Sequence, residues 1–215
     1  MASAATSSRP RRKPPEVRKG EIAEAAGQIA TADGLVQLTA KRVAEAVGVY
    51  PGLVNHYFRS ADELVAAGFA AATERRREQQ AAKIAEAAHD PVAELRMFLH
   101  DAISPEHDAA ALLWLDAWRE CPRRPALQRE VVRQMEVDIA DLTDILDRGI
   151  GAGQFGSGDS AAAAMRILAT IDGMFAQSAV RTAIAGTAII NYPVVAEMLL
   201  RTTEHELGLD AGALD

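Results

Sequence analysis

The sequence is poor in the residues from which most catalytic and metal sites are built. It contains one cysteine, Cys121, and five histidines in 215 residues. A single cysteine excludes a disulfide framework within one chain and a cysteine-rich zinc site, and it fits a reducing compartment. His-Glu-x-x-His, Gly-x-Ser-x-Gly, Gly-x-Gly-x-x-Gly and phosphate-loop motifs are all missing. We therefore predict that the protein is not an enzyme and uses no metal or cofactor.

Long hydrophobic runs are missing as well. No apolar stretch reaches the roughly 18 residues that a membrane-spanning helix needs, and the N-terminus lacks the hydrophobic segment of a signal peptide. We expect a cytoplasmic protein without a membrane partner. Aromatic residues make up only 5% of the chain, but 49% of it is apolar. Abundant alanine and few β-branched runs favour helices around a substantial core.

Negative charge dominates the chain but is unevenly distributed. The formal net charge is −7. Residues 1–60 carry nine Lys and Arg against five Asp and Glu, whereas the remainder carries 14 against 25. A basic part can bind phosphates while an acidic part is repelled by the duplex. The asymmetry favours nucleic-acid binding by the N-terminal region, although the whole-chain charge argues weakly against it.

Residues 39–64 carry the most informative pattern of the sequence. Thr39 can cap a first helix, Gly48 suits the left-handed residue that ends it, and Pro51 suits the first position of a second helix. Two inner faces follow helical spacing, formed by Val43, Ala44 and Val47 and then by Val54, Tyr57 and Phe58. The pattern predicts a helix-turn-helix, whose second helix enters the DNA major groove.

A further helix is predicted over residues 16–33, ended by Gly34. Its inner positions recur at helical spacing and are Ile22, Ala25, Ala26 and Ile29. Residues 1–15 are small, basic and proline-rich, so we expect disorder there. They are either a solubilising tail or an arm that reaches the minor groove with Arg9, Arg11, Arg12 and Lys13.

The order Thr39, Val43-Ala44, Gly48-Val49, Gly52, His56-Tyr57-Phe58 and Asp62-Glu63-Leu64 resembles the signature of the tetracycline-repressor (TetR) family. The resemblance implies an all-α regulator, with a three-helix DNA-binding domain followed by a helical bundle that binds a ligand and dimerises. It implies that Thr39 and Tyr57 hold phosphates and that Lys41 reaches a base edge. The whole expected DNA-binding set is Thr39, Lys41, Tyr50, Pro51, Gly52, Leu53, Asn55, His56 and Tyr57.

Two positions depart from the family pattern. Asn55 stands where the family usually has tyrosine, and Ala61 replaces a common lysine. The second departure removes an expected phosphate contact, for which Arg59 and the basic arm can compensate.

The remainder of the chain predicts further helices, over residues 60–86, 91–102, 106–120, 125–150, 160–185 and 194–207. We expect the charged stretch 73–86 to be a solvated helical face and Asp90 to cap the next helix. The inner positions of that helix and the following one include Val92, Met97, Leu112 and Leu115. The five glycines within residues 149–158 predict a flexible loop.

The expected ligand-binding residues are Met97, Trp114, Trp118, Asp172 and Phe175. Trp114 and Trp118 lie one turn apart, so they form either plain core or one wall of a pocket for an apolar or cationic molecule. Asp172 lies within an apolar helix, where it is paired, protonated, beside a wet cavity or simply exposed. Asp116 must point elsewhere. Ala117-Trp118 and Ile171-Asp172-Gly173 are similar to the choline-responsive repressors of betaine synthesis, a hint about shape rather than ligand.

We expect a homodimer through the two C-terminal helices. Two apolar faces are expected on residues 160–185: Met165, Leu168, Asp172, Phe175 and Ala179 on one, and Ile167, Ile171, Met174 and Ser178 on the other. The second face is predicted to meet the partner, with Ala176, Ala179 and Ala183 allowing close approach. The final helix adds Val194, Val195, Met198 and Leu199.

The sequence thus predicts three parts: a disordered basic arm (1–15), a helix-turn-helix domain (16–60) and a ligand-binding and dimerisation domain (61–215). The expected function is a repressor that binds a palindromic DNA operator as a homodimer and is released by a small-molecule inducer of unknown identity. The alternatives are an activator with the same fold, or a helical small-molecule-binding protein or enzyme that keeps the motif as scaffold.

Overall fold

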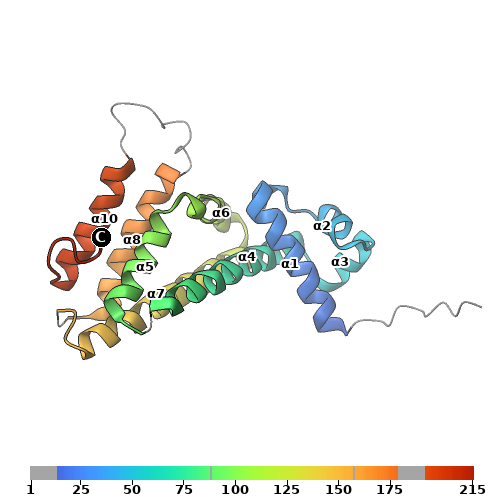
Figure 1. The fold of residues 1–215 in the computed structure, drawn as a ribbon. Coiled ribbons are helices and arrows are strands. Elements are labelled where there is room, and N and C mark those ends of the chain that lie inside the picture. The colour runs from blue at the N-terminus through green and yellow to red at the C-terminus, as the bar shows by residue number, and fades with distance from the viewer. Residues whose placement is uncertain (1–13, 88, 157, 179–191) are drawn as a thin grey trace, which may run out of the picture.

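The computed structural model describes residues 14–87, 89–156, 158–178 and 192–215. Every regular element in those residues is helical, and none of these helices is long and apolar enough to cross a membrane. Figure 1 shows α1, α2 and α3 at one end, α5, α8 and α10 at the other, and the long α4 and α7 running between them. The predicted all-α fold is confirmed.

The N-terminal end consists of α1 (Pro15–Asp33), a short 3-10 turn η1 (Leu35–Gln37), α2 (Ala40–Val47) and α3 (Pro51–Tyr57). The predicted local signals operate as expected. The Thr39 hydroxyl accepts a hydrogen bond from the Arg42 backbone N–H at 3.3 Å. Gly48 has φ 71° at the end of α2, a left-handed conformation that favours glycine. Pro51 is the first residue of α3.

The core beneath these three helices extends beyond residue 60. Ile22, Val43 and Val54 are fully buried in it. Three later helices contribute to the same cluster: α4 (Ala61–Ile84), α6 (Asp108–Glu120) and α7 (Pro125–Gly151). Their contributing side chains are Leu64, Val65, Phe69, Ala72, Leu113, Ala117, Leu127 and Val131. Burial of this apolar area stabilises the N-terminal helices on the rest of the molecule.

A second core lies at the other end, between α5 (Pro91–Ile103), α6, α7, α8 (Ser160–Ser178) and α10 (Tyr192–Leu207). Leu95, Leu99, Leu142, Leu146 and Leu199 are fully buried there. The C-terminal residues fold back onto it, because Leu214 is also fully buried and Arg96 donates to the carbonyl oxygen of Ala213 at 2.8 Å.

The solvated face predicted for residues 73–86 is wrong in part. The side chains of Arg76 and Arg77 are each only 21% exposed. They turn inward because acids on facing helices pair with them: Asp101 of α5 with Arg76, and Asp138 of α7 with Arg77. A charge run on one helix does not reveal acids that lie 25 and 61 residues further on.

Three smaller predictions are also corrected. Asp90 precedes α5 but its side chain makes no capping hydrogen bond, because it accepts from Gln154 at 2.9 Å. Leu112 is 47% exposed rather than buried. In the glycine-rich segment, α7 continues to Gly151 and Phe155 is buried against Gly149, where a larger residue would collide with the ring.

The expected partner-facing side of α8 is wrong. Ile167, Ile171 and Met174 are at most 5% exposed because they pack into the core of their own chain. Met165 on α8 is 58% exposed, as is Val194 on α10. Helical spacing finds two apolar faces without showing which one the chain itself covers. The side chains of Ser178, Ala179 and Ala183, which belong to the expected interface, lie outside the part of α8 that the structure describes.

Candidate DNA-reading face and candidate ligand cavity

Most of the predicted DNA-binding residues are exposed on the surface at α2 and α3. Tyr50 is 86% exposed, and Lys41, Asn55 and His56 are also exposed. Gly52 has open space where a side chain would begin, so a nucleic-acid backbone can approach the helix there. Of the remaining members of the set, Thr39 and Pro51 are exposed, whereas Leu53 and Tyr57 are half-buried. The arm residues Arg9, Arg11, Arg12 and Lys13 lie outside the described residues.

Neighbouring contacts fix the orientation of this surface. Arg42 of α2 pairs with Asp33 of α1 at 2.5 Å and donates to the Gln37 carbonyl at 3.3 Å. The His56 and Tyr57 rings meet edge to face, with centroids 5.3 Å apart. Lys41 is 79% exposed and only 4.0 Å from Glu45, a weak contact from which it can extend to a base. Lys41 is therefore the less constrained of the two cations of α2, because Arg42 is engaged by Asp33 and by the Gln37 carbonyl.

The carboxylate of Asp62 has a role that the sequence did not reveal. Its two oxygens accept from the backbone N–H groups of Ala126 and Leu127, at 2.8 and 3.3 Å. These groups open α7, where helical N–H groups have no partner of their own. In the first turn of α4 itself, the Ser60 hydroxyl accepts from the Glu63 N–H at 3.1 Å and caps the helix. Asp62 thus joins the start of α4 to the start of α7.

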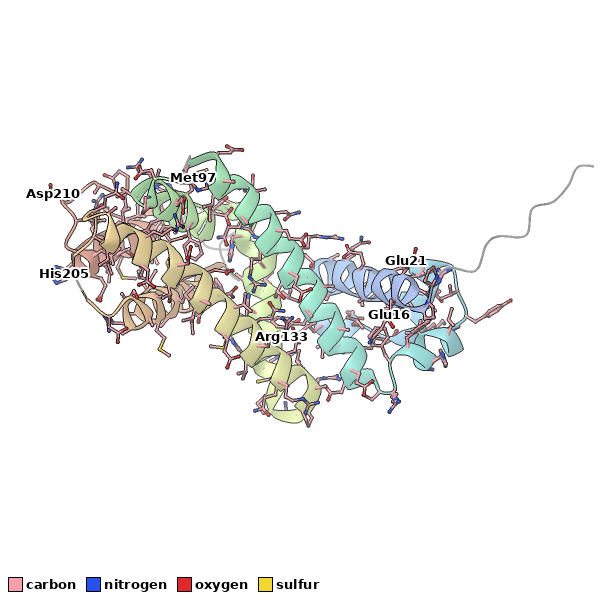
Figure 2. The ribbon with its side chains drawn as sticks, turned by 90° about the horizontal axis from the view of Figure 1, so that it is seen from below. Glu16, Glu21, Met97, Arg133, His205 and Asp210 are labelled. Atoms are coloured by element: carbon pink, nitrogen blue, oxygen red, sulfur yellow. The ribbon has the colours of Figure 1, made fainter. Side chains whose placement is uncertain are left out.

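A cavity of about 1060 Å³ lies between α1, α4, α5, α6, α7 and α8. The structure brings four of the five expected ligand-binding residues to its wall: Trp114, Trp118, Asp172 and Phe175. Met97 is not part of that wall. Its neighbour Phe98 lines the cavity instead, since successive helical residues point about 100° apart. In Figure 2 Met97 lies toward the end of the molecule opposite Glu16 and Glu21 of α1.

Three aromatic rings of the cavity wall, those of Trp114, Trp118 and Phe175, contact one another, and a buried ring packs behind them. The Trp114 and Trp118 centroids are 5.6 Å apart, and Trp118 stacks on Phe175 at 5.9 Å with an interplanar angle of 19°. Phe69 of α4 meets Trp114 edge to face at 5.0 Å. The two tryptophans also pack against both hydrophobic cores. The two tryptophans therefore belong both to the packed core and to the cavity wall.

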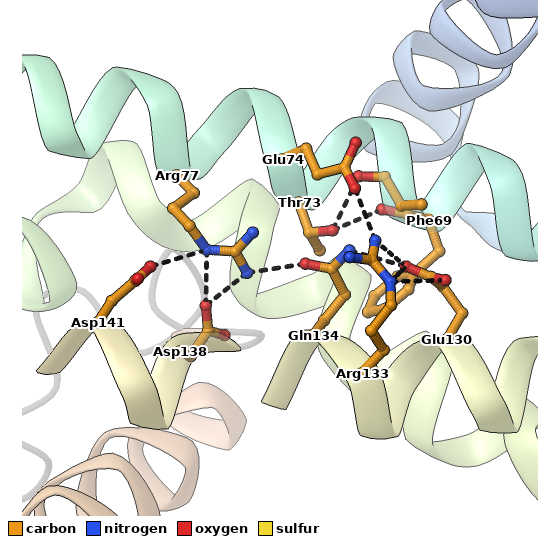
Figure 3. A network of polar contacts seen from close by, with 10 residues as sticks. Phe69, Thr73, Glu74, Arg77, Glu130, Arg133, Gln134, Asp138 and Asp141 are labelled. Carbon is orange, nitrogen blue, oxygen red and sulfur yellow. Dashed lines mark hydrogen bonds and ion pairs between the residues drawn. The ribbon is translucent and has the colours of Figure 1, made fainter. Parts of the chain in front are cut away.

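The arginines of the cavity wall are already engaged by acids. Arg77 donates to Asp138 at 2.7 Å and to Gln134 at 2.7 Å, and lies 3.3 Å from Asp141 (Figure 3). Arg76 pairs with Asp101, Arg75 with Glu24 and Arg166 with Glu206. In the same view Arg133 bridges Glu74 and Glu130 between α4 and α7. These pairs leave little positive charge for an anionic ligand.

Asp172 differs from these acids. Its carboxylate makes no hydrogen bond or ion pair with the described residues, although it is half-buried in the wall. Burial, together with the nearby negative charge of Asp138, raises its pKa from 3.8 to about 6. Burial also raises the pKa of Asp138, while its hydrogen bond to Arg77 acts in the opposite direction. At neutral pH the cavity therefore presents beside its aromatic rings a carboxylate that has no cationic partner among the described residues.

Comparison with known proteins agrees with this architecture. Residues 91–190 match the family model of the BetI-type transcriptional repressor C-terminal domain. A transcriptional regulator from Pseudomonas aeruginosa PAO1 superposes with a TM-score of 0.68 at 25% identity, over 94% of this chain and 95% of its own. A TetR transcription regulator from Haloarcula marismortui superposes with the same TM-score at 20% identity, over 90% of this chain and 97% of its own. The resemblance to the TetR family is confirmed. The weaker similarity to betaine-synthesis repressors is supported by the BetI-type match.

Two further solved structures share this fold. A regulator from Saccharomonospora viridis, solved in complex with choline, has a TM-score of 0.67 at 17% identity, with 89% of this chain and 98% of that chain covered. The Bacillus subtilis regulator FadR, solved in complex with stearoyl-CoA, has a TM-score of 0.63 at 18% identity, with 85% and 96% covered. At these identities the likeness shows the fold alone. No curated protein sequence matches the chain.

Proposed function

We propose that this TetR-family chain is a repressor that binds a palindromic operator as a homodimer and is released by a ligand in the cavity. One observation carries the proposal. Trp114 and Trp118 line the cavity and also pack on the core beneath the reading helices. A ligand that rearranges these rings must shift packing under α1–α3. If it favours a conformation that binds DNA poorly, it weakens DNA binding by its differential affinity for the two conformations.

The proposed dimer uses the uncovered sides of α8 and α10. Met165, Val194 and Met198 are 58%, 58% and 49% exposed there. Small exposed residues of α8 accompany them, namely Ala161, Ala169, Gly173 and Ala176. Figure 1 shows the two helices side by side, and they contact one another. Two such pairs about a two-fold axis form a four-helix bundle and present two reading heads to a palindromic site.

The chemistry of the cavity favours a small organic cation as the ligand. An aromatic surface attracts a cation through ring quadrupoles, and the Asp172 carboxylate supplies an opposite charge. The wall arginines are engaged by acids and so offer little to an anion. The choline complex of the Saccharomonospora relative supports this class, whereas the stearoyl-CoA complex of FadR represents the acyl alternative.

The test begins with duplexes selected from a random pool by the full-length protein. Phosphate-dominated binding must weaken as salt rises, so affinity is measured at two salt concentrations. Choline is then titrated into the complex. We expect it to quench tryptophan emission and release the duplex over the same concentration range. If stearoyl-CoA released the duplex and choline did not, the proposed ligand would be an acyl compound rather than an organic cation. If the protein selected no duplex, the remaining alternative would be a helical small-molecule-binding protein or enzyme that keeps the motif as scaffold.

A further inference from the structure

The connection between α1 and α2 is held by a side chain far away in the sequence. The backbone N–H of Leu35 donates to the Asp116 carboxylate of α6 at 3.2 Å, across 81 residues. The preceding residue, Gly34, has φ 89°, and a Cβ at that position would lie 2.8 Å from the same carboxylate oxygen. Glycine therefore permits both the left-handed backbone and the close approach of Asp116.

The same connection determines where the reading motif begins. The side chains of Leu35 and Leu38 are 1% and 5% exposed. Leu38 packs on α4 at Gly68, where an added Cβ would be 2.6 Å from its Cδ1 atom. The next residue is Thr39, the cap of α2. A displacement of the Leu35 backbone is therefore transmitted to the first turn of α2 through only four residues.

Helix α6 presents Asp116 and the cavity tryptophans on different sides. Trp114 and Trp118 lie two residues before and after Asp116, which places each about 200° around the helix from it. Two neighbouring residues of α6 pack into the N-terminal core, because Ala117 is fully buried and Leu113 is 4% exposed. A rotation or shift of α6 that repositions the tryptophans must also move the Asp116 carboxylate.

We propose that Asp116 is a positioning residue. It couples the cavity to the candidate DNA-binding helices α1–α3 through its hydrogen bond to the Leu35 backbone. The inference rests on the proposed function and adds the connection through which it operates. Arg119 lies 3.6 Å from the other Asp116 oxygen and is itself exposed, so it restrains the carboxylate without touching the connection. Coupling is reciprocal, so DNA binding must change the environment of the tryptophans even without a ligand.

The first measurement is the change in tryptophan emission when the full-length protein is saturated with its selected duplex. Trp114 and Trp118 are the only tryptophans, so the signal is assigned without labels. We expect a change in the wild type that falls by at least half in Asp116→Ala. Asp116→Asn should retain it because an amide oxygen still accepts a hydrogen bond. Arg119→Ala is the matched control and should also retain it.

The second measurement needs no variant. Hydrogen exchange at the Leu35 amide should slow when the duplex binds and quicken when choline is added, because the hydrogen bond protects that amide. An unaltered exchange rate, or a full emission change in a folded Asp116→Ala, would overturn the coupling. So would an equal loss in Arg119→Ala. Failure of the wild type to bind any duplex would instead contradict the proposed function, a result visible before any variant is examined.

Discussion

The head of the molecule (α1–α3) and its cavity end differ in how deeply their paired charged side chains are buried. In the head, ion pairs remain near the surface, as in Arg42–Asp33, whose side chains are 40% and 43% exposed. At the cavity end several carboxylates are buried: the Glu94, Asp101 and Glu204 side chains are 3–5% exposed and pair with arginines. A surface pair contributes little, whereas a buried one fixes geometry and is costly to break. The head is thus an apolar fold with a solvated outer face, and the cavity end contains buried carboxylates that are paired with arginines.

The largest effect should come from removing the partner of a buried carboxylate. Arg148 donates to Glu94 at 2.5 Å, and Arg148→Met would leave that carboxylate buried without its guanidinium. We expect a loss of about 3–5 kcal/mol in the free energy of unfolding, measured by urea denaturation. The matched change in the head, Arg42→Met, should cost about 0–1 kcal/mol because its pair is half-exposed. Equal losses in the two variants would remove the contrast between the two ends.

The dimer surface belongs to the cavity end but is apolar and uncovered. Met165→Glu should leave the monomer folded, because Met165 is 58% exposed. At the proposed two-fold interface it would bury an unpaired carboxylate from each chain, and we expect the dimer to weaken at least 100-fold. Sedimentation velocity and operator binding measure both consequences. The comparison variant is Met174→Glu, which should unfold the chain because Met174 is 4% exposed. A fully dimeric Met165→Glu would place the interface elsewhere.

The head was more predictable from sequence than the cavity. Thr39, Gly48 and Pro51 act on residues within four positions, so local pattern was enough to place α2 and α3. Asp62 and Asp116 act across 64 and 81 residues, and their partners are backbone N–H groups that carry no sequence signal. The aromatic wall was found because its spacing is helical.

Met97 shows the limit of that spacing. It is the immediate neighbour of Phe98, which lines the cavity in its place. A one-residue difference in register is decided by packing against other helices.

The reading face should respond more weakly than the buried pairs, and in two distinguishable ways. Lys41→Ala should cost about 1–3 kcal/mol at particular operator positions if the lysine reads a base edge. Tyr57→Ala should weaken binding to all duplexes alike, since a phosphate contact carries no base information. Competition with single-base operator variants separates the two patterns. Glu45→Ala is a control beside Lys41, and wild-type affinity in both test variants would remove these residues from the interface.

The smallest effect concerns Asp172, the cavity acid without a partner among the described residues. Its pKa is raised from 3.8 to about 6, chiefly by burial, so the folded state disfavours its ionised form. Below about pH 4 the group is protonated in both folded and unfolded chains and imposes no penalty. As pH rises from about 4 to 6 the unfolded chain ionises first, so the wild type loses stability, and the loss is constant above pH 6.

Asp172→Asn removes this titration. Its gain in unfolding free energy over the wild type should grow between pH 4 and 6 and reach about 1–2 kcal/mol at pH 7, a value reduced for solvent screening. The same substitution should weaken choline binding at pH 7, where the wild-type carboxylate is ionised. Urea denaturation across this pH range measures the first effect and tryptophan quenching the second, with Asp147→Asn as the exposed control on α7. A gain independent of pH would mean that Asp172 does not titrate in this range. The proposal of a cationic ligand would then rest on the aromatic wall alone.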